Sequence, residues 1–207
     1  MKVESDGKFW DELYRSRSAV WSGNPNIQLV SEVADLTPGT ALDVGCGEGA
    51  DAIWLAERGW RVTAADISSV ALERARAAMV SVDVARRIDW LHTDLVAGAP
   101  PSASYDLVSA QFMQLPREPR ELLFRRLAAS VKPQGTLLVV GHHPSDLQTT
   151  ASRPPLPELF YTAADVAALL EPNNWDIIVE ASRERSTTDR AGRTIAIHDT
   201  VLRARRR

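Results

Sequence analysis

Short apolar runs alternate with longer helical segments through the first two thirds of the chain, and this alternation constrains the fold more than any other feature. The apolar runs cover residues 40–45, 60–67, 88–95, 105–112 and 135–142, and each is bounded by Gly, Pro, Asp or Ser. Helical patterns lie between them. Neighbouring parallel strands need long return connections, so the pattern predicts an α/β fold with a doubly wound, mostly parallel sheet covered by helices on both faces.

The last third of the chain departs from this alternation. A Pro-rich stretch at residues 153–157 is expected to form a surface loop near the ligand edge, and a helix is predicted from about Thr162 to Leu170. Two strands follow, over 175–185 and 193–205, and the intervening "STTDRAG" is typical of a hairpin turn. This antiparallel pair is predicted to complete the sheet. The terminal "RARRR" is expected to be a frayed, solvated end.

Composition narrows the class of protein. The chain has 207 residues, 44% of them hydrophobic and 25% charged, which suits a single domain over 1–207. The net charge of −3 provides no general attraction to nucleic acid or membrane. Residues 1–18 lack the apolar region of a secretory signal, no run approaches the ~20 apolar residues of a membrane span, and Cys46 is the single cysteine. We therefore expect a cytoplasmic protein without internal disulfides.

A glycine-rich turn follows the first predicted strand, in the sequence "ALDVGCGEGADAIWLAERGWRVTAAD". Gly45, Gly47 and Gly49 permit a tight turn with positive φ and let a ligand approach the backbone closely. Asp66 ends the second predicted strand, where a carboxylate can accept both hydroxyls of a ribose. As a loop residue, it is expected to contribute little to folding. Since ligands of open parallel sheets bind beyond the carboxyl ends of the strands, the arrangement predicts a ligand that contains a nucleoside.

The glycine spacing and the charges distinguish between nucleosides. The turn has the spacing G-x-G-x-G instead of the dinucleotide fingerprint G-x-G-x-x-G, and it carries Asp43, Glu48 and Asp51 but no Lys or Arg. Carboxylates repel a pyrophosphate, whereas S-adenosylmethionine (SAM) presents a cationic sulfonium and an α-ammonium group. We therefore expect SAM as the cofactor. The spacing disfavours a nicotinamide-dependent oxidoreductase.

The chain resembles a class I SAM-dependent methyltransferase over nearly all of its length. "LDVGCGEG" corresponds to the family's first motif, "AADIS" to the ribose segment, "HTDL" to the adenine segment, "YDLVSAQF" to the fourth strand and "VKPQGTLLVV" to the fifth. The resemblance implies a Rossmann-like, seven-stranded sheet with an antiparallel seventh strand. The opening "FWDELYRSRSAVWSGNPN" and the ending "RTIAIHDTVLRARRR" are most similar to the small thiopurine, thiol and tellurite methyltransferases. "KPQG" departs from the family's frequent Gly-Gly pair, at a turn away from the site.

The resemblance assigns roles to residues around the glycine turn. Gly45, Cys46 and Gly47 would contact the methionine end of SAM through the backbone, Asp43 would hold the turn, and Gln111 would lie beside the methionine moiety. Asp66 would bind the ribose. Ile67 would pack on adenine, and Asp94 and Leu95 would recognise the amino edge of the adenine. Two of these residues have a plainer interpretation, because Asp94 also suits a turn cap and Cys46 is a small residue that fits the loop. Neighbouring carboxylates would raise the pKa of Cys46, so it is not expected to be a nucleophile.

Large aromatic residues mark the N-terminal segment 1–35. Trp10 and Tyr14 fall on one helical face, and Trp21 follows in "VWSGNP". They suit either a helix packed on the core or a mobile lid that closes over SAM and screens the acceptor from water, as the resemblance implies. As a lid, the segment would place all three residues against the cofactor, and residues 36–207 would form the SAM-binding core. The surrounding Ser, Arg and Gly favour movement.

The acceptor is expected to be a small molecule with a soft nucleophile, a thiol or another chalcogen. A thiol with a pKa of about 8.5 is a few per cent thiolate at neutral pH, so alignment suffices and a general base is optional. His142 and His143 are the base candidates near the ligand edge, although either could simply hydrogen-bond the loop. No Cys, Asp or third His falls at ligand spacing, so no metal is expected. Methylation of a phenol or quinol, and SAM binding without catalysis, are the alternatives.

Overall fold

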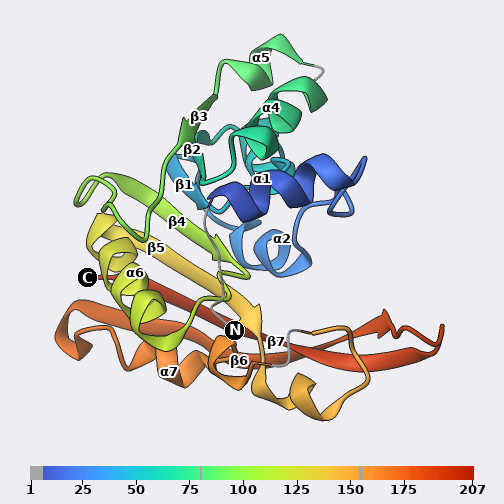
Figure 1. The fold of residues 1–207 in the computed structure, drawn as a ribbon. Coiled ribbons are helices and arrows are strands. Elements are labelled where there is room, and N and C mark those ends of the chain that lie inside the picture. The colour runs from blue at the N-terminus through green and yellow to red at the C-terminus, as the bar shows by residue number, and fades with distance from the viewer. Residues whose placement is uncertain (1–6, 80, 154–155) are drawn as a thin grey trace.

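A seven-stranded sheet carries the fold, and its strand order is β3-β2-β1-β4-β5-β7-β6 (Figure 1). The computed structural model describes residues 7–79, 81–153 and 156–207. The strands are β1 (Thr40–Val44), β2 (Arg61–Asp66), β3 (Ile88–His92), β4 (Tyr105–Gln111), β5 (Val131–His142), β6 (Trp175–Thr188) and β7 (Thr194–Arg206). β7 runs antiparallel to β5 and β6, whereas the pairs from β3 to β5 are parallel. The predicted sheet is therefore confirmed.

Helices connect the strands and cover the sheet. They are α1 (Gly7–Ser16), α2 (Ile27–Val33), α3 (Ala50–Glu57), α4 (Ser69–Ala78), α5 (Val82–Ala85), α6 (Arg117–Ser130) and α7 (Ala163–Ala167), with short 3₁₀ helices η1 (Pro144–Gln148), η2 (Pro157–Leu159) and η3 (Pro172–Asn174). α7 is shorter than predicted and begins at a capping box formed by Thr162 and Asp165. No described helix is long and apolar enough to cross a membrane. The predicted loop and lid fall partly on residues 154–155 and 1–6, which lie outside the described residues.

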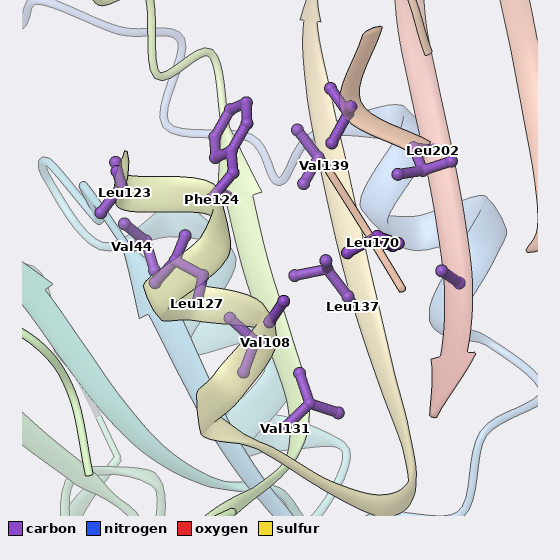
Figure 2. Close-up of a cluster of buried hydrophobic side chains, with 14 of the residues drawn as sticks. Val44, Val108, Leu123, Phe124, Leu127, Val131, Leu137, Val139, Leu170 and Leu202 are labelled. Atoms are coloured by element: carbon purple, nitrogen blue, oxygen red, sulfur yellow. The ribbon is translucent and has the colours of Figure 1, made fainter. Parts of the chain in front are cut away.

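Both faces of the sheet are covered, because the side chains of its central strands alternate between two apolar clusters. On β5, Leu137 and Val139 pack with α6, as Figure 2 shows, while Leu138 and Val140 pack with α2 and α3. All four side chains are fully buried. Burial of one Leu or Val side chain contributes about 1.5–3 kcal/mol, so these layers hold the sheet between its helices.

The C-terminal arginines at 203–207 are paired within the fold, so the expectation of a frayed end is wrong. β7 continues to Arg206, which donates to the carbonyl of Val131. Arg203 lies 3.6 Å from the buried carboxylate of Glu32. The end is held because β7 lies between β5 and β6, and the elements on both sides of it offer partners.

Gly141 in β5 has no room for a side chain. A Cβ at this position would lie 2.4 Å from the ring of Tyr161, which is 1% exposed. We expect Gly141→Ala to lower the free energy of unfolding by about 1–3 kcal/mol, because the buried ring cannot move aside. Chemical denaturation measures this change. In a Tyr161→Ala background the same substitution should be nearly neutral, and an equal loss in both backgrounds would contradict the steric cause.

Candidate functional site

The loops that follow β1, β2, β4 and β5 meet at one edge of the sheet. The order of the strands reverses between β1 and β4, which are neighbours in the sheet although β2 and β3 separate them in the chain. In open α/β sheets such a reversal forms a crevice beyond the carboxyl ends of the strands, where ligands bind. The structure therefore brings Gly45, Asp66, Gln111 and His142 to one edge, because each ends or follows one of these strands.

The glycine turn after β1 has the backbone conformation that the sequence predicted. Gly45, Gly47 and Gly49 have φ angles of 68°, 53° and 84°, all in the left-handed region. A Cβ would also lie 2.7 Å from the Met113 sulfur at Gly45, and 2.6 Å from the Trp90 ring at Gly49. The turn is therefore packed too tightly for side chains and presents bare backbone at the ligand edge.

Three carboxylates lie close together beneath this turn. Burial, together with the charges of Asp51 and Asp66, raises the pKa of Asp43 well above its usual range. Burial also raises the pKa of Asp51, to about 6. The Oδ2 atom of Asp43 is buried and has no hydrogen-bond partner among the described residues. Such a concentration of carboxylates would stabilise a cation bound at the turn.

Asp66 joins two loops of the site. Its Oδ2 accepts a hydrogen bond of 2.8 Å from the N–H of Gly47, and its Oδ1 accepts one of 2.8 Å from the N–H of Ser68. The residue is 8% exposed, and burial raises the pKa of its carboxyl group. Asp66 stands at the end of β2 as predicted. Its two backbone partners make it part of the loop structure, contrary to the expectation that it contributes little to folding.

The residues assigned to adenine follow β2 and β3. Ile67 is half-buried, and its carbonyl oxygen lies 3.0 Å from Nε2 of His92. Asp94 is exposed, and its Oδ1 accepts from two following backbone N–H groups at 2.8 and 3.1 Å, which is the turn cap that the sequence also allowed. Leu95 is half-buried and packs against the apolar cluster beneath α6. The cap places Asp94 on the surface, beside the end of β3.

Gln111 and Cys46 complete the predicted set around the turn. The Nε2 of Gln111 donates to Oγ of Ser109 at 2.8 Å, and its Oε1 is buried without a partner in the described part of the chain. Cys46 is buried, and burial together with the charges of Asp43 and Asp66 raises the pKa of its thiol well above the usual range. The thiol is therefore uncharged, in agreement with the expectation that Cys46 is not a nucleophile.

Contacts that sequence analysis missed hold the N-terminal segment over the glycine turn. Glu48 Oε2 accepts from the N–H groups of residues 20–21 at 3.2 and 3.1 Å, and its Oε1 lies 3.0 Å from Arg74. Asp11 in α1 accepts from Oγ of Ser68 at 2.6 Å, at the start of α4. In the sequence, Glu48 was recognised only as a charge of the turn. Asp11 gave no signal, because its partner is far away in the chain.

Two of the predicted aromatic residues lie over Gly47. Nε1 of Trp21 donates to the hydroxyl of Tyr14 at 2.9 Å, and a Cβ on Gly47 would lie 2.9 Å from that hydroxyl and 3.3 Å from Nε1. Tyr14 is 3% exposed, whereas Trp21 is 55% exposed. Trp10 is half-buried, and its ring centre lies 6.4 Å from that of Tyr14. Tyr14 therefore packs as a core residue, while Trp21 covers the turn at the surface.

His142 lies among aromatic rings at the end of β5. Its ring centre is 4.7 Å from that of Phe112, a residue that sequence analysis did not single out, and 6.2 Å from that of Phe160. Burial, and the charges of Arg153 and Arg185, lower the pKa of His142 to about 3. The imidazole is therefore neutral at physiological pH and is a weak proton acceptor.

The other base candidate, His143, makes a loop contact. Its Nδ1 lies 2.9 Å from Oγ of Ser145, at the start of η1, and its ring centre lies 6.3 Å from that of His198. Among the residues that the structure describes, no three or more His, Cys, Asp or Glu side chains are placed to hold a metal ion. The contact with Ser145 is the plainer of the two roles that the sequence allowed.

Comparison with known proteins agrees with this geometry. Residues 41–135 match the family model of a methyltransferase domain. An uncharacterized methyltransferase of Mycobacterium tuberculosis is 35% identical over 121 residues, which cover 58% of this chain and 59% of that protein. A probable thiol methyltransferase of Arabidopsis thaliana is 28% identical over 142 residues, which cover 66% and 62% of the two chains. A solved structure described with the conversion of a disulfide bond into a thioacetal group during echinomycin biosynthesis has a TM-score of 0.75 at 21% identity, covering 97% of this chain and 91% of that one.

The strand order and the likeness to that solved structure define the fold as a Rossmann-like α/β sheet. Residues 41–135 of this chain match a methyltransferase domain, and the solved structures of similar fold include an S-adenosylmethionine dependent methyltransferase from Mesorhizobium loti. The predicted enzyme class, a methyltransferase, and the predicted cofactor, SAM, are confirmed for this class of domain. The match spans 59% of the mycobacterial relative's own length, so the activity of the whole protein is a proposal.

The buried carboxylates make stability depend on pH in a definite direction. The pKa of Asp51 is about 6 in the folded protein, above the ordinary value of 3.8, so the folded state retains a proton that the unfolded chain has lost. The stabilisation due to that proton is complete below about pH 4 and is lost as the pH rises through about 6. Asp51→Asn mimics the protonated form and keeps an acceptor for the N–H of Asn26. The variant should therefore exceed the parent in stability by a margin that grows with pH.

Denaturation of both proteins between about pH 4 and pH 7 measures this margin, which we expect to reach about 1–3 kcal/mol. Asp83→Asn, in the first turn of the exposed helix α5, is the matched control and should show no such growth. A margin that stays constant with pH for Asp51→Asn would contradict the raised pKa.

Proposed function

We propose that the chain binds SAM at the glycine turn and transfers its methyl group to a small molecule whose nucleophile is a thiol or another soft chalcogen. One observation carries the cofactor assignment, namely that the glycine turn adjoins a cluster of buried carboxylates and is hydrogen-bonded to one of them. Asp43 Oδ2 and Gln111 Oε1 are buried acceptors without described partners, on the neighbouring strands β1 and β4. Buried acceptors without donors are unfavourable, and a bound ammonium group would satisfy them. The residues present therefore fit the cationic amino-acid end of SAM.

The remaining residues are assigned to the rest of SAM, which would lie along the same edge of the sheet. We infer that Gly45, Cys46 and Gly47 contact the methionine portion through their backbone, that Asp66 binds the ribose, and that Ile67, Asp94 and Leu95 surround the adenine. The burial of Asp66 between two loops supports its part, because a fixed carboxylate is already oriented toward the turn. Trp10, Tyr14 and Trp21 belong to the segment that covers the turn.

The protein's contribution to the reaction is alignment and exclusion of water. When bound, SAM supplies a methyl group on a positively charged sulfur, which leaves as a neutral thioether. Holding two reactants in register can contribute ~7–11 kcal/mol to lowering the barrier. Tyr14 and Trp21 lie over Gly47, where they would screen the reacting atoms from water.

The state of His142 favours an acceptor that ionises without help. With a pKa of about 3, the imidazole cannot hold the acceptor's proton at neutral pH, so it serves as a neutral packing and hydrogen-bonding group. A thiol with a pKa of about 8.5 is partly thiolate near neutrality and releases its proton to water, whereas a phenol with a pKa of about 10 is ionised far less. The similarity to a probable thiol methyltransferase of Arabidopsis thaliana supports this acceptor class and the small thiopurine, thiol and tellurite group.

Ligand binding and turnover test the proposal together. SAM and S-adenosylhomocysteine should raise the melting temperature, because a ligand at a hundredfold excess over its Kd stabilises the native state by about 2.7 kcal/mol. NAD and NADP should not. With labelled SAM, thiols should be methylated faster than phenols, quinols and amines. A shift with NAD and none with SAM overturns the proposal, a preference for phenols favours O-methylation, and binding without transfer to any acceptor favours a SAM-binding protein without catalysis.

We infer that the segment before residue 36 acts as a lid, and Trp21→Ala tests it. The side chain is 55% exposed, so its loss should change the free energy of unfolding of the ligand-free protein by less than about 1 kcal/mol. Because Trp21 covers Gly47 in the inferred SAM site, kcat/KM should fall tenfold or more. Leu122→Ala, at an exposed position of α6, is the control and should leave turnover unchanged. A loss of about 3–5 kcal/mol in the ligand-free variant would show that Trp21 is core packing, and normal stability with normal turnover would exclude both roles.

A further inference from the structure

Phe112 holds a strained backbone conformation at the end of β4. Its φ angle is 54°, which is rare for a bulky residue, and its N–H donates to the carbonyl of Val140 at 2.7 Å. This conformation brings the Phe112 ring to 4.7 Å from the ring of His142. Phe112 also follows Gln111 in the chain, and its ring packs against the apolar cluster that contains Cys46 of the glycine turn. Strain that persists at such a position indicates a functional role for the ring.

Arg185 of β6 extends toward the same ring. Its guanidinium carbon lies 6.0 Å from the centre of the Phe112 ring, and its side chain is 33% exposed. Nε donates at 2.8 Å to Oδ2 of the buried Asp199, which also accepts from Gln28 at 3.2 Å. Those contacts fix one edge of the guanidinium. Its two terminal amino groups make no hydrogen bond within the described ranges.

Together, Phe112, His142 and Arg185 would favour one kind of methyl acceptor. Phe112 and the neutral ring of His142 offer aromatic surface, and the free edge of Arg185 offers parallel N–H donors in the geometry that matches a carboxylate. Asp199 balances the charge of Arg185, so an anion would be recognised by directed hydrogen bonds more than by net positive charge. An acceptor that satisfies both features has an aromatic body and one anionic group.

We propose that Phe112, His142 and Arg185 form the acceptor subsite and that it selects an aromatic thiol carrying a carboxylate. The aromatic body packs against Phe112 and His142, and the carboxylate pairs with the free amino groups of Arg185. This inference rests on the proposed function, because it names the substrate class of the same site.

Matched acceptors test the subsite. The three isomers of mercaptobenzoate and the corresponding mercaptobenzamides differ in charge at nearly constant shape. With saturating SAM, at least one mercaptobenzoate should have a kcat/KM tenfold higher than its amide, and in Arg185→Gln this ratio should fall to about one. Arg190→Gln removes the same charge from the turn of the same hairpin, where Arg190 contacts Ser152, and should keep the ratio.

A second variant controls for loss of folding in Arg185→Gln. Arg185→Gln leaves the buried Asp199 without its cation, so the double variant Arg185→Gln/Asp199→Asn removes both charges and keeps the site neutral. The melting temperature and SAM affinity of each variant establish that it is folded and loaded. The ratio should fall in both variants, and a ratio that survives in both overturns the subsite.

Acceptor binding to the protein loaded with S-adenosylhomocysteine, measured by calorimetry, separates the two proposals. Tighter binding of a mercaptobenzoate than of its amide, without transfer to any acceptor, supports the subsite and overturns the proposed function. Transfer at equal rates to acids and amides overturns the subsite and leaves the function in place. Absence of binding by every mercaptobenzoate also overturns the subsite.

Discussion

The ligand edge depends on the hydrogen bonds of one carboxylate, that of Asp66. It accepts from the N–H of Gly47 in the turn after β1 and from the N–H of Ser68 in the turn after β2. Ser68 in turn donates its hydroxyl to Asp11, so the first helix is attached to the same point. The glycine turn, the start of α4 and α1 therefore share one buried anchor, and displacement of any of them disturbs the other two.

The carboxylates around this anchor oppose folding and favour binding at the same time. Asp43 and Asp51 are held where burial disfavours their charged forms, as their raised pKa values record. A cationic ligand reverses that balance, because it supplies the charge that the folded protein lacks. Functional sites often retain such unfavourable groups, since their energy is recovered when the ligand arrives. The neutral His142 shows the opposite arrangement, in which burial, together with the charges of nearby arginines, disfavours the protonated imidazole.

Sequence patterns predicted the structural features that a short stretch of residues determines by itself. Apolar periodicity located the strands from β1 to β5, and the glycine spacing located the turn with its positive φ angles. Contacts between distant segments could not be predicted in this way. The bonds of Glu48 to residues 20–21 and of Arg203 to Glu32 leave no pattern at either end. The position of His142 could be predicted, but its charge state depends on side chains that other loops bring to it.

The insertion of β7 between β5 and β6 makes the attachment of β6 depend on β7. β6 precedes β7 in the chain, yet it pairs with β7 and lies at the outer edge of the sheet. Its connection to the rest of the sheet runs through the pairing of β7 with β5, which closes a long stretch of chain and is therefore entropically unfavourable. The glycine turn follows β1, which pairs with β2 on one side and with β4 on the other. The strand that carries Arg185 is therefore joined to the strands around the glycine turn through β7, and loss of the β5–β7 pairing would detach Arg185 while the pairs beside the glycine turn remain.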